Sequence, residues 1–250
     1  MADIQLNNVS VAFPVYDNSS RSLKKRLVGA ATGGRIRSET GPSVVQALEN
    51  VTLHIQHGDR IGLVGRNGAG KTTLLRVLAG IYEPGVGTVR VEGQVAPLFD
   101  LSLGMDPEGT GYENILLRGL FLGMRRADIE ARLDEIAAFT ELGTFLGLPI
   151  RTYSAGMRLR LAFAVSTSFH PDILLLDEGM GAGDATFLEK VKRRLQEFTS
   201  KATIIVLASH SEQLVRQMCS TSVLMEHGQI IALGNTNQVL ALYQERTSRK

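Results

Sequence analysis

The segment GRNGAGKTT, at positions 65–73, constrains the fold of this chain more than any other stretch. Residues 59–64 before it have the pattern of a strand, and residues 72–79 after it have helical spacing. A strand, a G-x-x-x-x-G-K-T loop and a helix, in this order, form a phosphate-binding loop. The segment therefore predicts that the chain binds a nucleoside triphosphate.

Each residue type in this loop has a chemical task. The glycines allow backbone N–H groups to curl around the β-phosphate, Lys71 reaches the β and γ oxygens, and the Thr72 hydroxyl can ligate Mg²⁺. The predicted phosphate-binding set is Gly65, Arg66, Asn67, Gly68, Ala69, Gly70, Lys71, Thr72 and Thr73.

A second motif, DILLLDEG at positions 172–179, supplies carboxylates. Its apolar run predicts a buried parallel strand that ends beside the phosphate loop. We expect Asp177 to bind Mg²⁺ through water and Glu178 to polarise the water that attacks the γ-phosphate. The alternative is that two carboxylates simply end a strand. His210 follows another apolar run, ATIIVLASH, and is expected at the same edge, within reach of the γ-phosphate.

The stretch YSAGM, at positions 153–157, leads small residues into a segment with helical spacing and has no acidic residue nearby. The first turn of a helix exposes unpaired N–H groups and the positive end of its dipole. These residues alone leave two interpretations open, an ordinary serine cap or an anion site.

The remaining pattern predicts a mixed α/β chain. Its early strands follow one another, as antiparallel strands can, while its later strands alternate with helices, as parallel strands require. Expected strands lie at 4–13, 51–55, 59–64, 87–91, 173–176, 203–208, 223–226 and 229–233, and expected helices at 72–79, 112–122, 126–139, 155–168, 186–200, 213–218 and 238–247.

Composition argues against several classes of partner and location. The net charge of +2 is too small to argue for nucleic acid, and the single Cys219 fits a reducing compartment. The apolar runs are much shorter than the roughly 20 residues of a membrane helix, so another protein would have to anchor this chain at a membrane. Residues 17–43 are basic and rich in Gly and Ser, which indicates an insertion, either a disordered surface loop or a short basic helix that docks on a partner or on lipid headgroups.

The ordered motifs GRNGAGKTT, YSAGM, ILLLDE, GAGD and SH resemble those of the ATP-binding cassette (ABC) family of transporter ATPases. The resemblance implies an α/β P-loop NTPase fold at 1–234, with a RecA-like, mostly parallel sheet core, an antiparallel β subdomain and a helical subdomain at 100–168. A short C-terminal helix or tail would occupy 235–250. It also implies a head-to-tail homodimer in which each ATP lies between the phosphate loop of one subunit and the signature loop of the other.

The resemblance assigns roles to individual residues. The signature loop corresponds to Ser154, Ala155, Gly156 and Met157, the communicating aspartate to Asp184, the catalytic base to Glu178 and the switch histidine to His210. Asp100 is the best candidate where the family has a metal-coupling glutamine. Phe13 is the choice for the aromatic residue that stacks on adenine, with Tyr16 as its rival.

The segment from YSAGM to GAGD, the motif GYENI and the basic insertion look like the cassettes that export polysaccharides such as O-antigens, capsules and teichoic acids. This implies ATP and Mg²⁺ as ligands, a polytopic permease as partner, a lipid-linked polysaccharide as cargo and a peripheral place on the cytoplasmic face of the inner membrane. We expect no C-terminal carbohydrate-binding domain within this sequence. Within GYENILLRGLFLG, the residues Ile115, Leu116, Leu120 and Phe121 could admit a partner helix or belong to the core. The alternative function is a cassette ATPase that acts on ribosomes or DNA, or one that serves another substrate.

Overall fold

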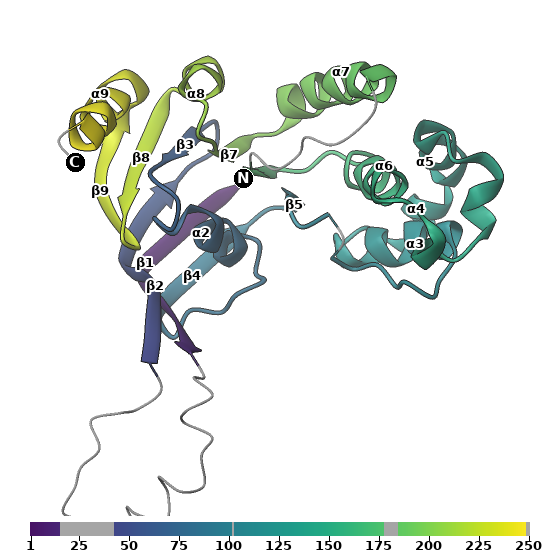
Figure 1. The fold of residues 1–250 in the computed structure, drawn as a ribbon, viewed down its shortest axis with the longest axis horizontal. Coiled ribbons are helices and arrows are strands. Elements are labelled where there is room, and N and C mark those ends of the chain that lie inside the picture. The colour runs from purple at the N-terminus through teal and green to yellow at the C-terminus, as the bar shows by residue number, and fades with distance from the viewer. Residues whose placement is uncertain (16–42, 102, 178–184, 249–250) are drawn as a thin grey trace, which may run out of the picture.

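The computed structural model describes residues 1–15, 43–101, 103–177 and 185–248, which form a two-sheet α/β structure with a lobe of helices at one side (Figure 1). The strands are β1 (Asp3–Val15), β2 (Ser43–Ile55), β3 (Arg60–Val64), β4 (Val86–Glu92), β5 (Val95–Leu98), β6 (Ile173–Asp177), β7 (Ile204–Ala208), β8 (Thr221–Glu226) and β9 (Gln229–Asn235). The helices are α2 (Lys71–Leu78), α3 (Gly111–Phe121), α4 (Arg126–Glu130), α5 (Leu133–Thr140), α6 (Ala155–Ser166), α7 (Ala185–Lys201), α8 (Glu212–Met218) and α9 (Thr236–Ser248), with 3₁₀ turns η2 (Gly143–Gly147) and η3 (Ile150–Thr152).

The two sheets have different pairing. The smaller sheet is antiparallel, with strand order β2-β1-β4. The larger sheet has the order β5-β6-β7-β3-β8-β9 and is parallel except for the β8–β9 hairpin. The structure therefore confirms the predicted combination of a mostly parallel core sheet, an antiparallel β subdomain and a helical subdomain.

Helix α2 contacts strands of both sheets, and apolar side chains fill both faces of the larger sheet. In β6, Ile173 and Leu175 pack toward α2 and the smaller sheet, whereas Leu174 and Leu176 pack toward the helices on the other side. This burial on both faces explains why β6 is a continuous apolar run instead of an alternating one.

Several predicted elements differ from the observed ones. The structure contains the edge strand β5, which the sequence patterns did not indicate, and the single helix predicted at 126–139 is two helices, α4 and α5. Strand β2 begins eight positions earlier than expected, at Ser43 instead of at position 51. The predicted insertion at 17–43 lies, except for Ser43, outside the described residues.

Candidate nucleotide site

The phosphate loop begins where β3 ends and closes at Gly70, immediately before α2. Gly65 and Gly70 have φ angles of 153° and 103°. A Cβ atom at Gly65 would lie 2.3 Å from the carbonyl oxygen of Met225, and one at Gly70 would lie 2.8 Å from that of Ala47. Because neighbouring backbone approaches so closely, these positions require glycine, and the loop is packed into place by β2 and β8.

Lys71 lies at the mouth of this loop and is 8% exposed. Its Nζ donates hydrogen bonds to the carbonyl oxygens of Gly65, at 2.5 Å, and Arg66, at 3.1 Å. The first turn of α2 contains no acidic residue of its own, so the helix itself does not neutralise the positive end of its dipole. The loop thus presents an ammonium group and a helix N-terminus to an incoming anion.

The carboxylate predicted to hold the metal lies beside the phosphate loop. Strand β6 pairs in parallel with β7, and β7 pairs with β3, so the carboxyl ends of all three strands share one edge. At that edge the Thr72 hydroxyl donates to Oδ2 of Asp177 at 2.9 Å. A hydroxyl and a carboxylate oxygen fit Mg²⁺, which usually keeps waters and takes one or two protein ligands together with phosphate oxygens.

A cavity of about 500 Å³ covers this edge, within the usual range of ligand pockets. It brings together residues predicted from distant parts of the sequence. Its lining comprises Phe13, Val45, Gln46, Ala47, residues 67–73, Asp177, Ala208, Ser209 and His210.

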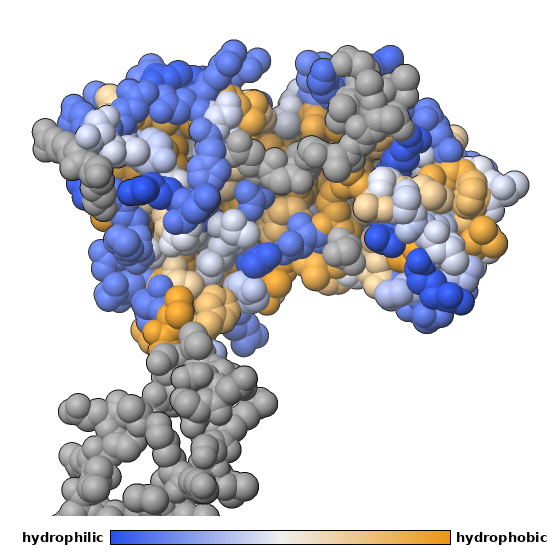
Figure 2. Space-filling view, in the orientation of Figure 1, coloured by the Kyte–Doolittle hydropathy of each residue, from blue (hydrophilic) through white to orange (hydrophobic). Residues whose placement is uncertain are grey.

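Phe13 supplies an aromatic wall to the cavity. Its side chain is 37% exposed, and its ring meets that of Tyr82 edge-on, with centroids 5.2 Å apart. Val44 and Val45 are exposed beside it, and Figure 2 shows apolar surface gathered at this end of the smaller sheet. Phe13 is therefore partly exposed at the cavity wall and stays the candidate for stacking on a nucleotide base, while Tyr16 lies outside the described residues.

Gly65, Arg66 and Asp100, although predicted for the site, do not line this cavity. Asp100 instead accepts a hydrogen bond from Nε of Arg76 at 2.8 Å and forms an ion pair with its Nη2 at 2.7 Å. Its carboxylate is thus held by a helix side chain and is absent from the cavity lining. Glu178 and Asp184 lie outside the described residues.

The signature loop caps α6. Ser154 is the N-cap residue, and its Oγ accepts a hydrogen bond from the backbone N–H of Met157 at 3.2 Å. Tyr153 fixes the loop to the rest of the helical lobe, because its buried hydroxyl donates to the carbonyl oxygen of Phe145 at 2.6 Å. Burial raises the pKa of Tyr153, so it remains a neutral donor.

The signature loop does not line the cavity that contains its own phosphate loop. Ser154 is exposed, and a Cβ atom at Gly156 would meet only the Ser154 hydroxyl, at 3.8 Å. The N-terminus of α6 is therefore open around Ser154 and Gly156, and the end of a helix dipole at such a place can attract an anion.

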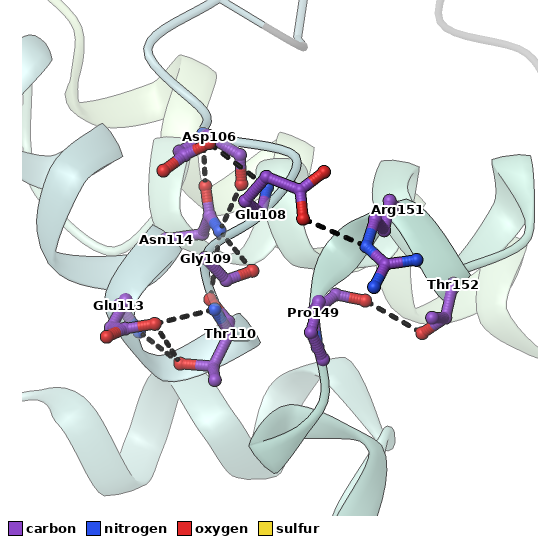
Figure 3. Close-up of polar contacts among 9 residues, drawn as sticks. All are labelled: Asp106, Glu108, Gly109, Thr110, Glu113, Asn114, Pro149, Arg151 and Thr152. Carbon is purple, nitrogen blue, oxygen red and sulfur yellow. Dashed lines mark hydrogen bonds and ion pairs between the residues drawn. The ribbon is translucent and has the colours of Figure 1, made fainter.

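The stretch at residues 106–110 ties the start of α3 to the segment before the signature loop (Figure 3). Asn114 is fully buried, and its side-chain amide donates to the carbonyl oxygens of Asp106, Gly109 and Thr110. Two backbone N–H groups of η3, those of Ile150 and Arg151, donate to carbonyl oxygens in the same stretch. The motif GYENI indicated only a subtype, so this clamp was not predicted, although Thr110 followed by Glu113 has the spacing of a capping box.

The helical lobe exposes part of the apolar set predicted for a partner helix. Ile115 is fully buried, so for this residue the core interpretation is correct, while Leu120 and Phe121 are about half exposed. A separate, mostly apolar hollow of about 390 Å³ lies beside α6. It is lined by Leu101, Met105, Pro107, Ile150, Arg151, Ala155, Arg158, Leu159 and Ala162.

None of the helices in the described part of the chain combines the length and the apolar character needed to cross a membrane.

Comparison with known proteins agrees with this site. The sequence profile of the family described as ABC transporter matches residues 48–181. Two solved structures share the fold at 20% identity. One is titled as the ATP-binding subunit of an ABC transporter, with a TM-score of 0.67 over 96% of this chain and 93% of that one. The other is a dimeric ATP-binding cassette in a post-hydrolysis state with ADP and Pi, with a TM-score of 0.65 over 93% of this chain and 98% of that one.

Curated relatives are more similar in sequence. The chain is 47% identical to the O-antigen export system ATP-binding protein RfbE of Yersinia enterocolitica, over 92% of this chain and 97% of the relative. It is 38% identical to an RfbB protein of Klebsiella pneumoniae, over 97% of both chains. It is also 35% identical to the teichoic acids export ATP-binding protein TagH of Listeria innocua, over 97% of this chain and 70% of that protein.

A phosphate loop joined to Asp177 on a mostly parallel sheet, with a signature loop on a separate helical lobe, defines an ATP-binding cassette. The chain belongs to the ABC transporter family and is an ATP-hydrolysing transporter subunit.

Proposed function

We propose that this chain is the ATPase subunit of an exporter that moves a lipid-linked polysaccharide of the O-antigen kind across the inner membrane. The observation that carries the proposal is the 47% identity to an O-antigen export protein over nearly the full length of both chains. In this proposal the subunit binds a polytopic permease at the cytoplasmic face of that membrane. The half-exposed side chains Leu120 and Phe121, and the apolar hollow beside α6, are the surfaces that would receive it.

The proposed active form is a head-to-tail homodimer with two composite sites. Lys71 and the backbone N–H groups of the phosphate loop hold the β- and γ-phosphates of one ATP, and the ring of Phe13 stacks on its base. The Ser154 hydroxyl and the first-turn N–H groups of α6 from the second copy approach the γ-phosphate from the other side. The open surroundings of the signature loop, away from its own cavity, support this arrangement.

Thr72 and Asp177 would hold Mg²⁺, which supplies charge neutralisation at the phosphates when bound. Glu178 would accept a proton from the attacking water, and His210, which lines the cavity, would hydrogen-bond the γ-phosphate. Asp184 would lie in the loop through which the two paired subunits communicate. Hydrolysis removes the anion that holds the two copies together, so the dimer opens and the permease receives the motion.

The proposal is tested by replacing the gene in its own host with a Lys71→Ala allele. Loss of the phosphate contact should abolish ATP hydrolysis, deplete the polysaccharide on the cell surface and leave lipid-linked polymer inside the cell. The polymer is measured by immunostaining intact cells and by gel analysis of extracted glycolipid. Arg125→Ala, at a side chain that is 84% exposed and does not line the cavity, serves as the control and should export normally. Normal surface polymer with the Lys71→Ala allele would contradict the export role, and co-purification with ribosomes or DNA would favour the alternative.

A further inference from the structure

Arg118, on α3, is a buried cation that the nucleotide chemistry does not use. It is 1% exposed, and burial lowers its pKa to about 10, which still leaves the guanidinium charged at neutral pH. Within the described residues no carboxylate lies within ion-pair distance of it. A buried charge without a counter-ion is unfavourable, so its contacts need an explanation beyond packing.

The guanidinium is held by oxygen atoms from two other parts of the helical lobe. Nε donates to the carbonyl oxygen of Ala162 at 3.2 Å, and both Nε and Nη2 donate to Oγ of Ser166, at 3.0 Å and 2.7 Å. Nη1 donates to the carbonyl oxygen of Leu103 at 2.5 Å. Ala162 and Ser166 belong to the second half of α6, whose dipole is negative at that end and favours a cation.

These contacts join the two walls of the apolar hollow beside α6. Ala162 lines the hollow from α6, while Leu101 and Met105, on either side of Leu103, line it from the opposite wall. A leucine at position 118 could pack between the helices without a desolvation penalty. It could not make directional bonds to both walls at once, which is what the guanidinium adds.

We propose that Arg118 is a positioning residue that fixes α6 relative to α3 and to the turn that holds Leu103, so that the signature loop meets the partner's ATP in the correct place. The inference rests on the proposed head-to-tail dimer. Because α6 begins directly after Ser154, a small rotation of this helix displaces the signature loop. A displacement of about 1 Å in a catalytic arrangement can lower a rate by about 100-fold.

The test compares wild-type protein with Arg118→Met, which keeps an unbranched apolar stem but removes the guanidinium and its directional bonds. The variant should bind a fluorescent ATP analogue as a monomer with unchanged affinity, because the phosphate loop is untouched. Its kcat should fall at least about tenfold, and its dimerisation with a non-hydrolysable ATP analogue and Mg²⁺, measured by analytical ultracentrifugation, should weaken by a similar factor. Arg118→Lys keeps the charge but cannot bond to all three acceptors at once. Its kcat and its dimerisation should lie between those of the wild type and of Arg118→Met.

Ser166→Ala provides a second route, because it removes one acceptor on α6 and leaves the guanidinium in place. It should show the same separation of effects, with normal nucleotide binding and reduced kcat, even if Arg118→Met does not fold. Wild-type kcat and dimerisation in both variants, or equal losses of nucleotide binding and kcat in Ser166→Ala, would overturn the positioning role. Failure of the wild-type protein itself to dimerise with nucleotide would instead contradict the proposed function.

Discussion

Gly156 is the residue at which the chemistry of the signature loop can be separated from its folding. The space around it is open, so a larger side chain fits there without moving its neighbours. Ser154 and Tyr153, in contrast, each hold part of the local structure through hydrogen bonds.

We predict that Gly156→Asp abolishes most ATPase activity and leaves ATP binding to the monomer intact. A unit negative charge about 4 Å from a phosphate charge costs about 4 kcal/mol at an effective dielectric constant of 20. The matched control is Gly156→Asn, which has the same shape without the charge and should retain activity within a few-fold. Equal activity of the Asp and Asn variants in a steady-state ATPase assay would show that the loop does not face ATP.

A site residue could be predicted when its position followed from nearby sequence, and not when it depended on a contact with another element. Thr72 and Asp177 were predictable because each follows a strand whose carboxyl end shares one edge of a parallel sheet, and the structure joins them. The environment of Asp100 could not be predicted, because its partner Arg76 belongs to a different element and no spacing rule relates the two residues. The sequence patterns did not single out Arg118, because arginine is almost never fully buried without a partner, whereas tertiary packing buries it here.

At the scale of elements, the predictions missed where a local signal was weak or misleading. Strand β5 has only four residues and includes Pro97, which argues against a strand but is tolerated here because β5 lies at the sheet edge. In β2, Asn50 has a φ angle of 51° at an irregularity in the pairing with β1, so a bulge within one long strand was interpreted as its start. The break between α4 and α5 at Arg132 contains neither Gly nor Pro, and the sequence offered no sign of it.

The capping box of α3 should give the protein a titratable contribution to stability. The backbone N–H and hydroxyl of Thr110 both donate to Glu113, and these bonds lower its pKa below the ordinary value of 4.5. Because the pKa is lower in the folded state, the contribution is fully present above pH 4.5 and is lost as the pH falls through the folded pKa. We predict that the stability advantage of wild-type protein over Glu113→Ala, measured by urea unfolding, shrinks over this acidic range.

The matched control is Glu113→Gln, whose side-chain oxygen can accept the same bonds but does not titrate. Its advantage over Glu113→Ala should stay constant across the same pH values. A wild-type advantage that also stays constant would show that the charge of Glu113 adds nothing to the cap.

At the scale of the whole molecule, the phosphate loop and the signature loop belong to different parts of the fold. The first is fixed between the two sheets, and the second begins a helix of the lobe seen on the right of Figure 1. A composite site between two copies predicts a specific result from mixing inactive subunits.

We predict that Lys71→Ala and Gly156→Asp subunits, each inactive alone, regain ATPase activity when mixed. In a mixed head-to-tail dimer, the intact Lys71 of one copy faces the intact signature loop of the other, so one complete site forms. Activity is measured across mixing ratios, and it should peak near equal amounts. The control is Lys71→Ala mixed with a Lys71→Ala, Gly156→Asp double variant, which can form no complete site. No recovery in the first mixture would contradict the head-to-tail arrangement.

Ser154 carries a last consequence for how this chain can change. Its oxygen accepts the bond that starts α6, and a hydroxyl has one proton left to donate. In the proposed dimer, helix initiation and phosphate recognition would thus depend on a single atom. An aspartate would preserve the helix start but repel the nucleotide, and an alanine would lose both contributions. No substitution at this position is therefore expected to raise thermal stability while keeping ATPase activity. Directed evolution for a more stable ATPase should leave Ser154 unchanged.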